Sequence, residues 1–120
     1  MSPRNIRCTR DGKAKLIDFG AMAPTGAAAL QLVGTPAFCP PEVVQRSTLD
    51  VRADLFSVGA TLYYALTGSV PFHARTFAEA IRAWGTKPAR PSSRVAGIPA
   101  ALDDLVLSLI SIEPAARPHT

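Results

Sequence analysis

The longest apolar stretch of the chain lies between residues 53 and 66. Read as a helix, it places large side chains on every side, a pattern typical of a helix buried in a core or in a membrane. At 1.5 Å per residue the helix is about 21 Å long and contains Asp54, whereas a membrane span needs about 20 apolar residues. We therefore predict a core helix over 53–66. Asp50 caps its start, and Gly68 ends it in the left-handed conformation.

Two further helices are indicated by 3.6-residue periodicity. Thr76 and Glu79 form a capping box, which opens a helix over 76–84 that stops at Gly85. The second helix covers 100–110. The positions on the apolar faces of these helices are Phe77, Ala80, Ile81 and Trp84 for the first, and Leu102, Leu105, Val106, Leu109 and Ile110 for the second. We expect these helices and the 53–66 helix to share one core, with Leu62 and Leu105 inside.

The remaining segments are short. Two apolar-containing runs, 6–9 and 14–17, flank Arg10-Asp11-Gly12-Lys13, and this pattern predicts a β-hairpin. Pro41 favours the start of a short helix through Gln45. Residues 86–99 hold three prolines and are expected to be an irregular connection. The predicted fold is mainly α, with one short two-stranded β ribbon.

Composition narrows the function classes. The chain has 120 residues with 48% apolar content, enough for one domain. Its net charge is +4, but the basic residues read as scattered and are not interleaved with aromatics, so we expect no nucleic-acid partner. Cys8 and Cys39 lack metal-site spacing, and reduced thiols favour a cytoplasmic location. We also expect no membrane segment, and the N-terminus lacks the apolar region of a signal peptide.

Several short motifs then occur in a fixed order. They are Asn5, Asp18-Phe19-Gly20, Gly34-Thr35-Pro36, Pro40-Pro41-Glu42, Asp54-Leu55-Phe56-Ser57-Val58-Gly59 and Arg117. A lone Asp-Phe-Gly is a weak signal, since a turn after a strand often reads that way. The whole ordered set resembles the large, C-terminal lobe of a eukaryotic-type serine/threonine protein kinase of the bacterial kind. The resemblance covers nearly the whole chain.

The resemblance implies a nucleotide and metal site. Asp18 corresponds to the carboxylate that holds Mg²⁺ against the phosphates of ATP, and Asn5 to the amide that provides a second metal contact. Oxygen ligands of this kind suit Mg²⁺. Phe19 is expected to pack beneath the site, and Gly20 to allow the backbone to move. The alternative for Asn5 is an ordinary loop asparagine near a turn.

The resemblance also implies roles for four other residues. Thr35 corresponds to the threonine that positions the hydroxyl of a Ser or Thr protein substrate. Glu42 and Arg117 are expected to form a buried ion pair, although two unrelated surface charges remain the alternative. Asp54, at the head of the central helix, is expected to be buried and to receive amide hydrogen bonds from the catalytic loop.

The sequence departs from the family pattern in what it lacks. Residues 1–120 contain no Gly-rich phosphate loop, no strand lysine with a helix glutamate, and no His-Arg-Asp motif. Ser2 stands where a phosphate-contacting lysine is usual. We therefore expect residues 1–120 to be a partial kinase domain without the small lobe, running from the end of the catalytic loop through the activation segment to the central and following helices. Alone, this segment is expected to be inactive.

Three readings of the function stay open. The chain is either part of a kinase that uses ATP and Mg²⁺ or a pseudokinase-like lobe that binds partner proteins through the helix at 76–84. A small α-rich domain unrelated to kinases is the third reading, and it requires that the motifs do not converge in space.

Overall fold

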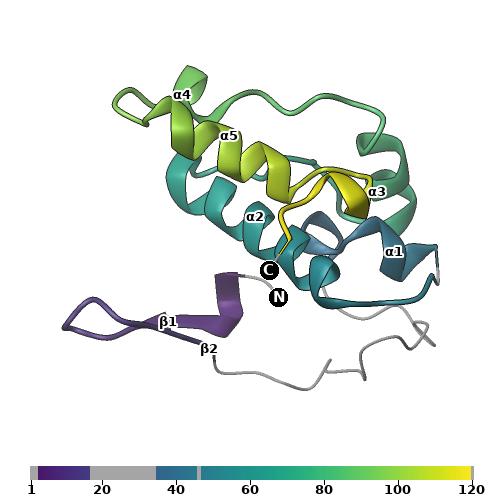
Figure 1. The fold of residues 1–120 in the computed structure, drawn as a ribbon, viewed down its shortest axis with the longest axis horizontal. Helices are drawn as coiled ribbons and strands as arrows, with labels where there is room; N and C mark the ends of the chain where they lie inside the picture. The colour runs from purple at the N-terminus through teal and green to yellow at the C-terminus, as the bar shows by residue number, and fades with distance from the viewer. Residues whose placement is uncertain (1–2, 17–34, 46, 120) are drawn as a thin grey trace.

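The helices gather into one body, from which a two-stranded ribbon extends (Figure 1). The computed structural model describes residues 3–16, 35–45 and 47–119. The helices are α1 (Pro41–Val44), α2 (Val51–Thr67), α3 (Phe77–Ala83), α4 (Pro91–Arg94) and α5 (Ala100–Leu109); the strands are β1 (Ile6–Cys8) and β2 (Ala14–Leu16); and three 3₁₀ turns are η1 (Pro3–Asn5), η2 (Pro36–Phe38) and η3 (Pro114–Ala116). The predicted helical fold with a short ribbon is confirmed.

Helix α2 lies at the centre of the body. The Asp50 side chain accepts a hydrogen bond from the Arg52 N–H at its start, and Gly68 ends it with φ 72°, as predicted. Burial is confined to one face, made of Ala53, Phe56, Ser57, Gly59, Ala60 and Tyr63. The expectation of burial all round is therefore wrong. Asp54 lies outside this face and is exposed.

Helices α2 and α5 approach each other closely at a glycine. A Cβ added at Gly59 would lie 2.5 Å from Cβ of Leu109, which is closer than any real contact. Next to this point Val106 is fully buried, and Leu62 and Leu102 pack against the edge of the core. Leu105 is 45% exposed, so its predicted place in the core is wrong. Within α5 the face toward α2 is centred on Val106 and Leu109, and Leu105 falls outside this face.

Helix α3 begins as its sequence predicts. The Thr76 hydroxyl accepts from the Glu79 N–H at 3.1 Å. Glu79 in turn accepts from the N–H of Arg75, one residue before the cap, at 2.6 Å. The apolar face is narrower than predicted, because Ala80 is buried but Ile81 is 55% exposed.

The connection over 86–99 contains a helix that the proline pattern does not predict. Pro91 provides the first residue of α4, and Asp103 on α5 fixes its first turn. The buried Asp103 carboxylate accepts from the Ser92 N–H at 2.9 Å, from the Ser92 hydroxyl, and from Nε of Arg90 at 3.3 Å. These hydrogen bonds hold the pKa of Asp103 below its ordinary value, with the Ser92 hydroxyl as the main cause.

The ribbon formed by β1 and β2 is antiparallel and lies largely in solvent. Ile6 pairs with Leu16, Arg7 with Lys15 and Cys8 with Ala14. Gly12, with φ 84°, closes the loop, as a three-residue hairpin turn requires. Among the described residues, no helix is long and apolar enough to cross a membrane.

Candidate functional site

The candidate site is built on residues 35–45, which follow the Gly-Thr-Pro and Pro-Pro-Glu pattern. Thr35 is exposed at the start of η2, and its carbonyl accepts from the Phe38 N–H at 3.0 Å. The Thr35 hydroxyl makes no capping bond to η2. Pro36 opens η2 and Pro41 opens α1, because proline fixes φ and lacks the N–H that a first turn leaves unpaired.

Residues of helix α2 contact the segment 35–45 and hold it in place. Buried Ser57 donates a hydrogen bond from Oγ to the Phe38 carbonyl at 2.8 Å. The Phe38 ring meets Tyr64 edge to face, with centroids 6.2 Å apart. Burial raises the pKa of the Cys39 thiol to about 11. A thiol that stays protonated is a poor nucleophile, so Cys39 is a packing residue.

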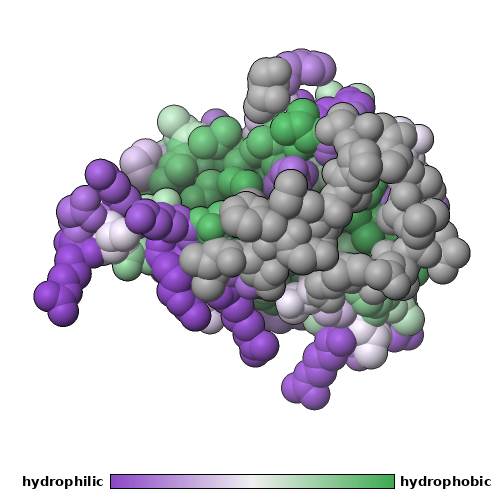
Figure 2. Space-filling view, turned by 90° about the horizontal axis from the view of Figure 1, so that it is seen from below, coloured by the Kyte–Doolittle hydropathy of each residue, from purple (hydrophilic) through white to green (hydrophobic). Residues whose placement is uncertain are grey.

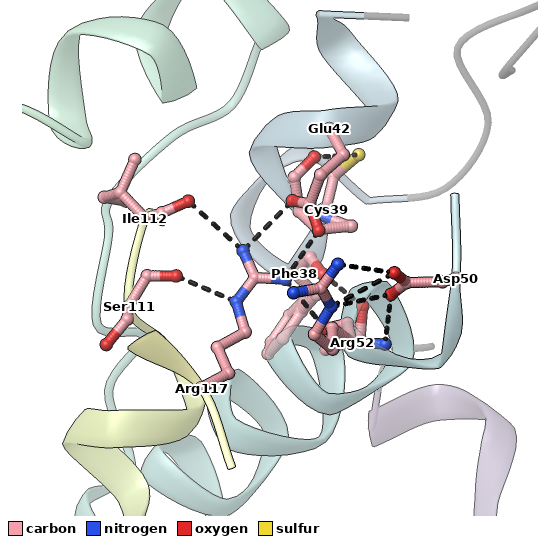
Figure 3. Close-up of polar contacts among 10 residues, drawn as sticks. Phe38, Cys39, Glu42, Asp50, Arg52, Ser111, Ile112 and Arg117 are labelled. Atoms are coloured by element: carbon pink, nitrogen blue, oxygen red, sulfur yellow. Dashed lines mark hydrogen bonds and ion pairs between the residues drawn. The ribbon is translucent and has the colours of Figure 1, made fainter. Parts of the chain in front are cut away.

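Glu42 and Arg117 form the buried ion pair that the resemblance implies. The Nη1–Oε1 distance is 2.6 Å and the Nη2–Oε2 distance is 3.0 Å, so the contact is bidentate (Figure 3). Arg117 is 2% exposed and Glu42 is 7% exposed. The pair joins α1 to the end of the described chain across 75 sequence positions. The alternative of two unrelated surface charges is therefore wrong.

Arg117 uses the full capacity of its guanidinium group. Beyond Glu42, it donates to the carbonyls of Ser111 at 2.9 Å, Arg52 at 2.7 Å and Ile112 at 3.3 Å (Figure 3). Since guanidinium has five N–H donors, every one is satisfied. The group also lies over the Phe56 ring, 5.1 Å from its centroid. A buried charge needs such complete pairing.

A second ion pair lies beside the first. Arg52 contacts Asp50 through Nη2 at 2.7 Å and through Nε, while its own carbonyl accepts from Arg117 (Figure 3). Hydrogen bonds from Arg52 hold the pKa of Asp50 below its ordinary value. The cap of α2 is thereby connected to the buried pair, a link that the sequence analysis missed. The signal was present in the Asp50 to Arg52 spacing at the helix start.

The residues predicted to hold nucleotide and metal are only partly described. Asn5 ends η1 directly before β1 and is half-buried. Asp18, Phe19 and Gly20 lie outside the described residues. Among residues 3–16, 35–45 and 47–119, no group of three His, Cys, Asp or Glu side chains gathers as a metal site.

Asp54 does not occupy the predicted environment. It is exposed in the first turn of α2, and no described group donates a hydrogen bond to its side chain. A buried environment for Asp54 is therefore wrong, whereas its hydrogen bonds from catalytic-loop amides stay a prediction, because Met1 and Ser2 of that loop lie outside the described residues. Because Ala53, Phe56 and Ser57 set the buried face, the position between them points to the other side of the helix.

Comparison with known proteins agrees with this geometry. Residues 1–120 match the protein kinase domain family. The serine/threonine-protein kinase PknL of Mycobacterium tuberculosis is 34% identical over 122 residues, which are 98% of this chain and 31% of PknL. The serine/threonine-protein kinase PknB of Mycolicibacterium smegmatis is 34% identical over 127 residues, covering all of this chain and 20% of PknB. The chain thus spans a third or less of these relatives, and it belongs to the protein kinase family, on the serine/threonine branch of the bacterial kind.

Proposed function

We propose that this chain is the C-lobe portion of a serine/threonine protein kinase that transfers phosphate from ATP to protein hydroxyl groups. The observation that carries this proposal is the Glu42–Arg117 pair, together with the Ser57 bond to Phe38. These contacts hold the segment after Thr35 firmly against α2. A substrate-facing loop needs a fixed base of this kind, because kinase catalysis depends largely on positioning and on stabilising charge.

Asn5 and Asp18 are the proposed Mg²⁺ ligands. Their amide and carboxylate oxygens fit the preference of Mg²⁺ for hard oxygen donors. When bound, the ion would neutralise charge on the phosphates of ATP. Phe19 and Gly20 are proposed to support the same site. Thr35, exposed and with a hydroxyl free of capping bonds, is proposed to orient the substrate hydroxyl.

Residues 1–120 on their own are proposed to be inactive. They hold no His-Arg-Asp motif and no Gly-rich loop, so they provide no catalytic base and nothing to order the phosphates. A cytoplasmic location belongs to the same proposal. The free thiols of Cys8 and Cys39 support it.

A protein-binding module is the second candidate. It is favoured by Ile81, which is 55% exposed on α3 although its neighbour Ala80 is buried. A single exposed apolar side chain is common on protein surfaces, so Ile81 offers one contact for a partner helix or loop and no more. This function needs neither Mg²⁺ nor ATP, so one experiment separates the two candidates.

The experiment joins Met1 to the preceding segment of a related serine/threonine kinase, which contains the Gly-rich loop, the lysine and the His-Arg-Asp motif. Transfer of labelled phosphate from ATP to dephosphorylated casein is then measured. We expect Mg²⁺-dependent transfer by the joined chain and none by residues 1–120. Asp18→Asn should lower the rate at least about a hundredfold, about 2.7 kcal/mol of barrier.

Glu113→Gln is the control for the Asp18 variant, because it also removes one carboxylate charge, at an exposed position. It should transfer phosphate at the parent rate. A joined chain that melts cooperatively and binds ATP but transfers no phosphate would contradict the kinase proposal and favour the binding module. Activity in residues 1–120 alone, lost in Asp18→Ala, would contradict the proposed inactivity.

A further inference from the structure

The net positive charge of the chain is concentrated in residues 3–16, which form η1 and the ribbon. Residues 3–16 hold five basic side chains and one acidic one, a net of +4, which equals the net charge of the whole chain. The rest of the chain is balanced. All five basic residues, Arg4, Arg7, Arg10, Lys13 and Lys15, are exposed. The ribbon extends away from the helices in Figure 1, and Figure 2 shows hydrophilic side chains projecting at that end of the molecule.

The strand register sorts these charges onto one face. Residues that pair directly share a face, and neighbours along a strand alternate. Arg7 and Lys15 are directly paired, so both lie on one face, and Ile6, Cys8, Ala14 and Leu16 lie on the other. Thr9 and Lys13 continue this pairing, since the Lys13 carbonyl accepts from the Thr9 N–H at 2.8 Å. Lys13 is two residues from Lys15, so it lies on the same face as Arg7 and Lys15. We call Arg7, Lys13 and Lys15 the cationic face.

Folding gives no reason for this arrangement. Two like charges directly opposite each other destabilise a strand pair. Among the described residues, the one carboxylate near the cationic face is Asp11, whose contact with Lys13 is 3.5 Å long and solvent-exposed on both sides. Within residues 3–16, 35–45 and 47–119, the one acceptor of the Arg7 guanidinium is the Arg4 carbonyl, at 3.3 Å. The charges are thus left available for an external anion.

We propose that the cationic face is a docking surface for an acidic peptide segment of a partner protein. The face extends over the two residue steps from Lys13 to Lys15, at about 3.4 Å each, so about three acidic residues of an extended peptide match it. Residues 3–16 contain no aromatic side chain on which bases could stack, which disfavours single-stranded nucleic acid. The apolar face points away from the charges, so the two cannot enter one membrane surface together. The proposal is independent of the kinase function, because docking needs no ATP.

The test measures fluorescence anisotropy of a labelled peptide of about six glutamates with the 120-residue chain. The ribbon variant is R7Q/K13Q/K15Q. The control variant, R75Q/R82Q/K87Q, removes the same number of charges from exposed positions on the helical body. We expect at least about tenfold weaker binding for the ribbon variant and less than about threefold for the control. Binding to the parent should weaken as salt rises from about 20 to about 300 mM.

Folding of the ribbon variant is checked by its helical circular dichroism, which should match the parent because the ribbon has no buried residue. Equal loss in both variants would overturn the proposal, since net charge alone would then explain binding. It is also overturned by the absence of binding at low salt. Tighter binding to an oligothymidylate of the same length, or to phosphatidylserine vesicles, would overturn the choice of a peptide.

Discussion

At the scale of single residues, Arg117 has a hydrogen-bond acceptor for every donor of its buried guanidinium group. Each of its five N–H donors has an acceptor, and its planar group covers Phe56. A lysine has only a compact ammonium group and cannot reproduce this fork. The identity of the residue, and not only its charge, is therefore required at this position.

Glu42→Gln is expected to destabilise the fold by about 3–5 kcal/mol, because it leaves the buried Arg117 cation without a counter-charge. Urea unfolding measures the change. Glu113→Gln also removes one carboxylate charge, but from an exposed site. Its free energy of unfolding should lie within about 0.5 kcal/mol of the parent's. Equal stability of the two variants would show that the pair does not contribute to folding.

The Asp103 carboxylate is expected to make the free energy of unfolding depend on pH. Its pKa is depressed in the folded state, mainly by the Ser92 hydroxyl, so the folded chain binds this proton less readily than the unfolded chain. The stability it contributes is present above its ordinary pKa of about 4 and is lost as pH falls further. The difference in unfolding free energy between parent and Asp103→Asn should be constant above about pH 5 and should shrink below about pH 4.

The neighbouring Asp104→Asn is the control for this measurement, because the Asp104 side chain is 70% exposed. It should leave the pH profile close to that of the parent. A difference between parent and Asp103→Asn that grows toward acid would contradict the assigned direction.

At the scale of elements, α5 shows that an apolar position in a helical periodicity is not always a buried one. Val106→Ala removes two methyl groups from a fully buried site and should cost about 1–3 kcal/mol. Leu105→Ala removes more carbon, but from a side chain that is 45% exposed, and should change stability by about 0.5 kcal/mol or less. Urea midpoints of the two variants, taken side by side, test the corrected core. The reverse order would restore Leu105 to the core.

Local signals explain which elements the sequence predicts well. Asp50, Gly68 and the Thr76–Glu79 box act within one turn, so their geometry follows from neighbouring residues. Helix α4 was missed because its first turn depends on Asp103, eleven positions away. The exposure of Asp54, Ile81 and Leu105 was missed for a related reason. Periodicity locates an apolar stripe, but its width depends on the packing partner.

At the scale of the whole molecule, the buried pair was predicted from resemblance rather than from chemistry. No local pattern joins Glu42 to Arg117, since their contact depends on how α2 and α5 pack. The charged ribbon shows the opposite case. Its basic residues look scattered in the sequence, at positions 7, 10, 13 and 15, and only the strand register brings three of them to one face. Asp18, Phe19 and Gly20 stay predictions.

The final prediction concerns how stability is distributed between the helical body and the ribbon. The ribbon has three-residue strands without a buried side chain, whereas Phe56, Ala60 and Tyr63 on α2 are fully buried. A two-stranded hairpin is marginally stable by itself, so its amides should exchange through local opening, and those of α2 only through global unfolding. Hydrogen exchange followed by mass spectrometry should therefore show fast labelling of residues 6–16 and slow labelling of 56–64. Equal protection of both segments would mean that the ribbon unfolds together with the core.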